Sequence, residues 1–261
     1  MDSSPAYLRW TNALVVRRQE DMKARLFCLP FAGGGASVFR EWPRKLSRDV
    51  QVIALQLPGR ESRWNEPPCE AISEIVDWLV ASLGPILDQP FAIFGHSMGA
   101  MLGFEVARAL QLNGNCPAHL FVSGFRAPQD PDPDPPMHRL PNEELISHLG
   151  SLNGIPKPIL DHPELIALLL PVLRADLKIC ETYNYRAGEP LHCPISAYGG
   201  ANDLKAPPAS LDGWRIQTSK EFTMRVFPGD HFFLESARDA LLGQIFTDLM
   251  RSLRRHDATI S

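Results

Sequence analysis

The chain has 261 residues, 44% of them hydrophobic and 21% charged, which are the proportions of a globular protein able to bury a sizeable core. With 26 Lys and Arg against 30 Asp and Glu, the net charge of −4 gives no overall electrostatic support for nucleic-acid binding. No stretch approaches the ~20 apolar residues of a membrane span, and residues 1–21 lack a signal-peptide pattern, so we expect a cytoplasmic protein with no membrane partner.

The cysteines favour a reducing compartment. Their number is odd and no two of them form a CxxC pair, so we interpret them as reduced thiols. We expect neither a metal site nor a bound cofactor. The five positions are Cys28, Cys69, Cys116, Cys180 and Cys193.

The first strand is predicted over residues 25–30, after a loosely held lead-in with a short edge strand over Asn12–Arg17. A glycine-rich loop over residues 31–37, FAGGGAS, follows this strand, and its glycines allow backbone N–H groups to approach a ligand closely. The loop is no dinucleotide fingerprint, because Val38 stands where a further glycine is needed, and no Gly-Lys-Ser/Thr of a phosphate loop follows. It is either a plain tight turn or half of an oxyanion hole, in which backbone N–H groups stabilise a negatively charged oxygen.

The next two elements are a strand over residues 50–57 and a helix over residues 72–83. The strand is an apolar run closed by Pro58 and Gly59. In the helix, apolar residues recur at spacings of three and four, and Gly-Pro ends the run.

Residues 91–100, with the sequence FAIFGHSMGA, carry the most informative motif of the chain. A strand-like run passes through Gly-His-Ser-Met-Gly into a helix-forming run, which is the context of a Gly-x-Ser-x-Gly nucleophile elbow. Gly95 and Gly99 avoid collisions with the neighbouring strand and helix, and a helix starting at Met98 aims its N–H groups at charge near Ser97. The alternative is a glycine-rich turn with an incidental serine. With the elbow present, the oxyanion-hole interpretation of the earlier glycine-rich loop is favoured.

From residue 125 to about residue 190 the alternation of strands and helices is interrupted. The proline-rich run over residues 127–136 predicts a stiff, extended connector, and helices are predicted over residues 143–152 and 164–183. A helical insertion between core strands lies where a lid over a pocket would be placed. It is either such a lid or a structural flap that does not move.

Strands resume after this insertion. They are predicted over residues 194–199 and 222–227, in addition to an earlier one over residues 118–123, and a last helix covers residues 236–255. The alternation of strands and helices predicts an α/β fold, with a mostly parallel sheet covered by helices on both faces, in a single domain spanning residues 1–261.

Two residues after the late strands complete a candidate catalytic group. A serine hydroxyl needs a base within hydrogen-bond reach and a third group that orients the base. In α/β-hydrolases these follow in the order Ser, Asp or Glu, then His, and Asp203 and His231 each come just after a predicted strand. Asp230 is an alternative acid, although it is the immediate neighbour of the histidine. His96 is too close in sequence to Ser97 to reach its hydroxyl with proper geometry.

Five motifs occur in order within residues 25–250. They are Leu29-Pro-Phe-Ala-Gly-Gly-Gly35, Leu57-Pro-Gly-Arg-Glu-Ser-Arg63, Phe94-Gly-His-Ser-Met-Gly-Ala100, Leu173-Arg-Ala-Asp176 and Phe227-Pro-Gly-Asp-His-Phe-Phe233. Together they resemble the type II thioesterases, stand-alone editing enzymes of polyketide and nonribosomal peptide synthesis. The medium-chain acyl thioesterase that acts with animal fatty-acid synthase is similar.

The resemblance implies an α/β-hydrolase fold with a helical lid. It also implies hydrolysis of acyl thioesters on the phosphopantetheine arm of an acyl or peptidyl carrier protein. We expect the carrier in trans and the enzyme itself to be a monomer. The family's catalytic serine, aspartate and histidine correspond to Ser97, Asp203 and His231. Its oxyanion donors correspond to the backbone N–H groups of Ala32 and Met98.

Two rival functions keep the same fold. A small-molecule carboxylesterase would use the same three side chains, and comparing thioesters with oxygen esters of one acyl group would separate the two. A non-catalytic binding module would be expected to lack a member of the catalytic group, and none is missing here.

Several cations have both a structural and a functional interpretation. Arg60 and Arg63 are expected to pair with carboxylates and fix their loop. Arg126, Arg174 and Lys178 either meet an acidic carrier protein or form a solvated helix face.

Overall fold

The computed structural model describes residues 22–151, 154–155 and 157–260, so the edge strand predicted over Asn12–Arg17 lies outside the described residues. Within the described part, six parallel strands form a sheet in the order β2-β1-β3-β4-β5-β6. This sheet confirms the predicted α/β fold class. The strands are β1 (Ala24–Leu29), β2 (Val50–Ala54), β3 (Phe91–His96), β4 (His119–Ser123), β5 (Ile195–Gly200) and β6 (Phe222–Phe227).

The strand order reverses at β1, which pairs with β2 on one side and with β3 on the other. Ligands of open α/β sheets bind at such a reversal, beyond the carboxyl ends of the strands. In the register of β1 and β3, Leu29 lies opposite Gly95. The glycine-rich loop after β1 and the turn after β3 therefore leave the sheet side by side.

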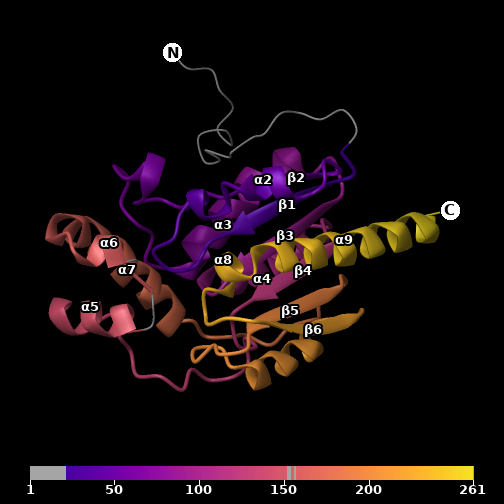
Figure 1. Cartoon of the computed structure of the whole chain (residues 1–261). Coiled ribbons are helices and arrows are strands. Elements are labelled where there is room, and N and C mark those ends of the chain that lie inside the picture. The colour runs from indigo at the N-terminus through magenta and orange to yellow at the C-terminus, as the bar shows by residue number, and fades with distance from the viewer. Residues whose placement is uncertain (1–21, 152–153, 156, 261) are drawn as a thin grey trace, which may run out of the picture.

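Helices cover both faces of the sheet, and strand residues alternate between two cores. In β1, Phe27 and Leu29 pack with α3 and α4, whereas Leu26 and Cys28 pack on the opposite face with α2, α8 and α9. Side chains of both faces are buried, which explains why the strands are continuous apolar runs in the sequence. Figure 1 shows α9 lying across one face of the sheet. These helices are α2 (Trp42–Lys45), α3 (Ile72–Leu83), α4 (Met98–Leu112), α8 (Phe233–Ser236) and α9 (Arg238–Ile260).

The insertion between β4 and β5 forms a separate helical layer with its own apolar core. Its helices are α5 (Asn142–Ser151), α6 (Lys157–Leu160) and α7 (Pro163–Glu181), which gather at one end of the molecule (Figure 1). Leu145 of α5 and Leu173 and Leu177 of α7 belong to this core. We refer to α5–α7 and the connector over residues 127–141 as the lid.

Two of the lid's cations make contacts within the chain. Arg174 donates to the backbone oxygens of His138 and Leu140, and so fastens the connector to α7. The Lys178 ammonium lies 2.5 Å from Glu70. For both side chains the contacts favour the structural interpretation.

Several elements differ from the sequence expectation, among them the one-turn helices α2 and α6, which were not predicted. The helix predicted over residues 236–255 is α9, which begins two residues later and ends five residues further along the chain, and the one-turn α8 that precedes it was not predicted. A 3-10 helical segment at Pro208–Gln217 was not predicted, since its alternating polar and apolar residues have no α-helical period. It buries Trp214, whose indole N–H donates to the Phe125 carbonyl at 2.9 Å.

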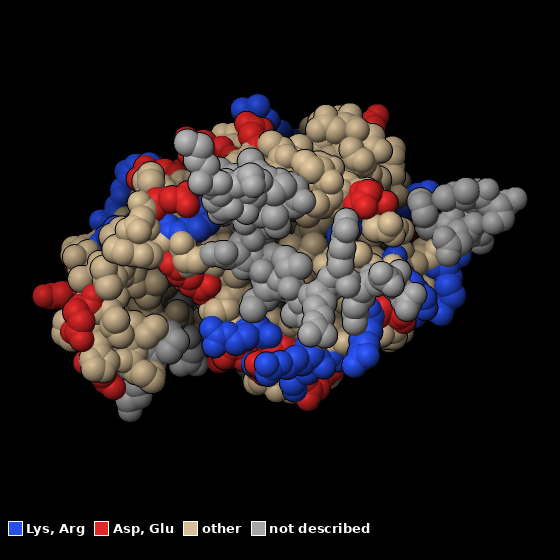
Figure 2. Space-filling view, turned by 90° about the horizontal axis from the view of Figure 1, so that it is seen from above, with Lys and Arg blue, Asp and Glu red and all other residues tan. Residues whose placement is uncertain are grey.

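The surface carries both signs of charge. On the coloured part of the face shown in Figure 2, Lys and Arg side chains lie close to Asp and Glu side chains, in keeping with the small net charge. None of the helices in the described part of the chain has both the length and the apolarity needed to cross a bilayer.

A buried polar network joins β4, β5 and α9. The His119 ring lies with Nδ1 2.8 Å from Ser252 Oγ and Nε2 2.9 Å from Ser196 Oγ. Ser196 Oγ also donates to the buried Asp248 carboxylate at 3.1 Å. Burial, together with the nearby charge of Arg251, lowers the pKa of His119 to about 3, so its imidazole is neutral in the folded protein.

Acid should therefore destabilise the fold through His119. An imidazole in the unfolded chain has a pKa of ~6.5, so between that pH and about 3 the unfolded state binds one proton that the folded state does not. The stabilisation from neutral His119 is fully present above ~6.5 and is lost as the pH falls toward the folded pKa. Between about pH 6 and pH 4, the unfolding free energy should fall more steeply with decreasing pH in the wild type than in His119→Gln. The difference between the two slopes should be about 1.4 kcal/mol per pH unit.

Urea denaturation at a series of pH values measures this slope. His192→Gln, at an exposed position, is the matched control. Equal slopes in the wild type and His119→Gln would contradict the prediction.

Candidate active site

Ser97 occupies a strained turn between β3 and α4. Its backbone has φ 54° and ψ −120°, a conformation that non-glycine residues rarely adopt. The Ser97 N–H donates to the Ser123 carbonyl at the end of β4, at 2.7 Å. α4 begins at Met98, as predicted, so the serine stands at the N-terminus of a 15-residue helix.

The two glycines of the turn are required by close backbone packing. A Cβ atom at Gly95 would lie 1.9 Å from the Gly99 carbonyl oxygen, and one at Gly99 would lie 2.2 Å from the Leu29 carbonyl oxygen. Both distances are far below van der Waals contact. The turn is therefore pressed between α4 and the end of β1, as the Gly-x-Ser-x-Gly pattern predicts.

Asp203 and His231 are brought together from the loops after β5 and β6. His231 Nδ1 lies 2.9 Å from Asp203 Oδ2, and the Asp203 side chain is fully buried. The other carboxylate oxygen accepts from the backbone N–H groups of Lys205 and Ala206, each at 2.9 Å. These contacts leave the carboxylate one orientation, with one oxygen toward the imidazole.

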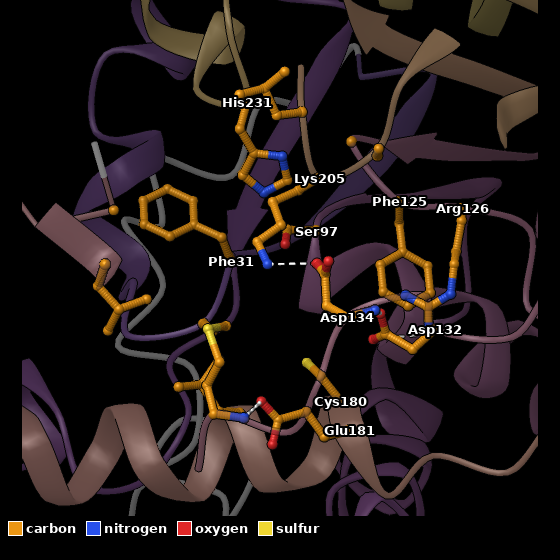
Figure 3. A pocket seen from close by; sticks show the side chains of 18 of the residues that line it. Phe31, Ser97, Phe125, Arg126, Asp132, Asp134, Cys180, Glu181, Lys205 and His231 are labelled. Carbon is orange, nitrogen blue, oxygen red and sulfur yellow. Dashed lines mark hydrogen bonds and ion pairs between the residues drawn. The ribbon is translucent and has the colours of Figure 1, made fainter. Parts of the chain in front are cut away.

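Ser97 and His231 line the same cavity, and Figure 3 shows the ring of His231 pointing toward Ser97. Since Nδ1 is bonded to Asp203, Nε2 is the ring nitrogen available to the serine. Asp230, the alternative acid, accepts from the Phe232 N–H at 2.9 Å through Oδ1. The geometry thus favours Asp203 as the acid that orients His231.

The ring of His96 packs against that of His231. The His96 ring is fully buried, with Nδ1 2.9 Å from Ser123 Oγ, and its centroid is 5.2 Å from that of His231. Burial, followed by the charge of His231, keeps the pKa of His96 well below its usual range. A neutral ring that is fully buried and does not line the cavity is in agreement with its exclusion as the base.

The two predicted oxyanion donors are Met98, which follows the serine in the chain, and Ala32, which lines the same cavity. Met98 is the first residue of α4, where a backbone N–H has no acceptor within the helix. Ala32, in the glycine-rich loop after β1, lines the cavity together with Ser97. The Phe31 ring packs edge-on against His96 and Phe232, with centroid distances of 6.0 and 5.1 Å.

The cavity has a volume of about 220 Å³ and extends from Ser97 into the lid. Burial raises the pKa of the Cys180 thiol, which keeps it protonated and makes it part of an uncharged wall. A pocket of this composition suits an extended apolar group attached near the serine. Its apolar walls are formed by Met137, Leu149, Leu173, Leu177 and Cys180.

The proline-rich connector contributes charged residues that sequence reasoning did not single out. Asp134 lies 2.6 Å from the Lys205 ammonium and Asp132 lies 3.1 Å from the Arg126 guanidinium, and all four side chains line the cavity (Figure 3). The alternation of Asp and Pro was the only signal of this role. It places successive carboxylates on a rigid, extended chain. Arg126 is thus paired within the chain, which favours its structural interpretation.

Among the described residues, no group of three or more His, Cys, Asp or Glu side chains is arranged to hold a metal ion. The five cysteines, all of them described, are free thiols.

Comparisons with known proteins agree with this geometry. Residues 24–249 match the family model of the thioesterase domain. The gramicidin S biosynthesis protein GrsT of Aneurinibacillus migulanus is 46% identical over 217 residues, which cover 83% of this chain and 85% of that protein. The medium-chain S-acyl fatty acid synthase thioesterase of Homo sapiens is 36% identical, with 80% of each chain covered.

A solved structure is similar over most of its length. The RedJ thioesterase from the prodiginine biosynthetic pathway in Streptomyces coelicolor superposes with a TM-score of 0.82 at 38% sequence identity. The match covers 87% of this chain and 90% of RedJ. RedJ therefore shares the α/β-hydrolase architecture described above.

The packing at the elbow predicts opposite effects for two glycine-to-alanine changes. Gly99→Ala should lower the unfolding free energy by about 3 kcal/mol, because its methyl group collides with backbone that cannot move away. Gly243→Ala, in open space on α9, should raise it by about 0.5–1 kcal/mol through helix propensity. Urea denaturation measures both, and a Gly99→Ala protein as stable as the wild type would contradict the packing argument.

Proposed function

This chain belongs to the thioesterase family, and we propose that it hydrolyses acyl thioesters carried on the phosphopantetheine arm of a carrier protein. The family establishes an α/β-hydrolase enzyme that cleaves thioesters. The observation that supports the rest is that Ser97 and His231 line one cavity, part of whose wall is apolar, and that His231 is hydrogen-bonded to Asp203.

Acylation begins at Ser97. Asp203 holds His231 with Nε2 toward the serine, and that nitrogen takes the proton as Ser97 Oγ attacks the thioester carbonyl. The tetrahedral intermediate collapses when the carbon–sulfur bond breaks. The leaving thiolate takes the proton from His231, and the acyl group remains on the serine as an ester.

Two backbone donors stabilise the intermediate in this proposal. The N–H groups of Met98 and Ala32 bind the carbonyl oxygen as it becomes negative, and the N-terminal end of α4 adds its partial positive charge. Loss of one such donor typically costs ~10²–10³ in rate.

Deacylation uses the same residues with water as the nucleophile. His231 accepts a proton from a water molecule as it attacks the acyl-serine, and then returns it to Ser97 Oγ. The products are the free carboxylic acid and the regenerated enzyme.

The lid walls of the cavity are suited to bind the acyl chain. Leu173 and Leu177 lie one turn apart on α7 and are buried in the lid core, and both line the cavity. Apolar contact of this kind binds a hydrocarbon chain through burial of its surface. The lid is therefore the part of the molecule that selects among acyl groups.

The partner is proposed from the relatives. GrsT and RedJ are named for gramicidin S and prodiginine biosynthesis, which supports a role beside a synthetase whose intermediates are held on carrier proteins. We propose that the carrier is supplied in trans and that the enzyme acts as a monomer. The free thiols support a cytoplasmic location.

A substrate comparison tests this function. The enzyme should hydrolyse acyl-pantetheine and acyl-carrier thioesters of graded chain length, and should favour them over oxygen esters of the same acyl groups. Ser97→Ala should reduce turnover by at least ~10⁴-fold, because the nucleophile is lost. Ser82→Ala, which removes a buried hydroxyl on α3, is the matched control.

Two outcomes would contradict the proposal. Preference for the oxygen esters would indicate a carboxylesterase, and substantial turnover by a folded Ser97→Ala protein would remove the nucleophile assignment.

A second comparison separates the two candidate acids. Asp203→Asn should lower kcat by ~10⁴-fold, because an amide favours the wrong tautomer of His231. Asp230→Asn should lower kcat by less than about tenfold, since its carboxylate caps the Phe232 N–H and Asp203 holds the ring. Steady-state kinetics of the two variants measure the difference, and the reverse ranking would exchange the assignments.

A further inference from the structure

A buried ion pair connects the lid to the loop after β2. Arg60 lies in that loop and Asp176 lies on α7, and their side chains are only 6% and 1% exposed. The contact is bidentate, with Arg60 Nη1 2.6 Å from Asp176 Oδ2 and Nη2 2.8 Å from Oδ1. The two residues are 116 positions apart in the chain.

The pair also holds the glycine-rich loop. Asp176 Oδ2 accepts from the Gly33 N–H at 2.7 Å, and Arg60 Nη1 donates to the Gly34 carbonyl at 3.2 Å. Gly33 has φ +78°, and a Cβ atom there would lie 2.5 Å from Leu173 Cδ2 on the same helix. α7 therefore fixes this loop by both a polar and an apolar contact, at the residue that follows Ala32.

Stability alone does not explain why this contact is ionic. Replacing a buried ion pair by apolar side chains is often neutral or stabilising, because taking two charges out of water is costly. The ionised carboxylate of Asp176 accepts three hydrogen bonds at once in a fixed geometry, one from the Gly33 N–H and two from the Arg60 guanidinium. That property suits the positioning of a loop.

The position of Asp176 on α7 links this contact to the acyl pocket. Leu173, Asp176 and Leu177 are spaced by three and four residues and so share one face of the helix. The two leucines line the cavity, while the aspartate holds Gly33. One placement of α7 thus builds the wall of the pocket and fixes the loop that carries Ala32.

We propose that Arg60 and Asp176 are positioning residues that keep the Ala32 N–H directed at the oxyanion. The oxyanion hole is then complete only when α7 is packed against the glycine-rich loop. This inference rests on the proposed function, in which Ala32 is an oxyanion donor. Neither side chain touches the reacting atoms, and their effect passes through the backbone of Gly33 and Gly34.

Two conservative substitutions test the proposal. Asp176→Asn keeps the shape of the side chain, but its amide group must direct NH₂ toward Arg60 or toward Gly33, both of which are donors. Arg60→Lys keeps the charge and loses the bidentate contact. Asp248→Asn is the matched control, because Asp248 is an equally buried carboxylate that accepts from Tyr198 on the opposite side of the sheet.

The first readout is independent of thioesterase activity. An alkyl fluorophosphonate reacts when Ser97 Oγ bonds to phosphorus, fluoride leaves and His231 takes the proton, while the phosphoryl oxygen occupies the oxyanion hole. The rate constant of this labelling should fall by about 10–100-fold in Asp176→Asn, and by a smaller factor in Arg60→Lys. In Asp248→Asn it should change by less than about twofold, even though the melting temperature falls.

The second readout is steady-state hydrolysis of octanoyl-pantetheine. In Asp176→Asn, kcat should fall by about the same factor as the labelling rate while KM changes by less than about threefold, because the oxyanion exists only in the transition state. Circular dichroism establishes that each variant is folded.

The outcomes separate this proposal from the proposed function. If the wild type hydrolyses no acyl thioester, the proposed function fails, yet slower labelling of Asp176→Asn still supports the positioning role. Unchanged labelling in folded Asp176→Asn overturns the role, and so does an equal loss in Asp248→Asn. If Asp176→Asn does not fold, Arg60→Lys decides, and labelling at the wild-type rate in that variant overturns the proposal.

Discussion

The structure depends on the close backbone contact at the turn between β3 and α4. Gly95 and Gly99 allow α4 to approach the ends of β1 and β3 at distances that no side chain would permit. This approach forces the positive φ of Ser97 and directs the serine away from the sheet, toward the cavity. The strain of one residue is tolerated because the packing of a central strand and a buried helix determines the turn completely.

The order of the strands brings the remaining groups to the same edge. β1 and β3 are neighbours at the reversal of the strand order, so their following loops are adjacent. β5 and β6 extend the same parallel sheet, and the loops after them carry Asp203 and His231. Residues far apart in sequence meet because parallel strands all end on one side.

The buried ionisable side chains are either neutral or paired with a partner of opposite charge in the cases described above. His96 and His119 have a lowered pKa and are neutral, so neither brings an uncompensated charge into the interior. The Arg60–Asp176 pair is ionic, and it coincides with the junction of the lid and the glycine-rich loop. At this junction the buried ion pair holds the backbone of the glycine-rich loop in position.

The sequence by itself determined the parallel α/β architecture, the elbow at Ser97 and the order of serine, aspartate and histidine, because steric rules and hydrophobic periodicity act over a few neighbouring residues. Only the tertiary structure decided that Asp176 would hold Gly33, 143 residues away, and that Asp132 and Asp134 would line the cavity. The short helix α8 before α9 was likewise not visible in the pattern. Such features depend on which distant segments pack together. A local pattern of side chains does not indicate which residue from elsewhere in the chain will become its neighbour in the fold.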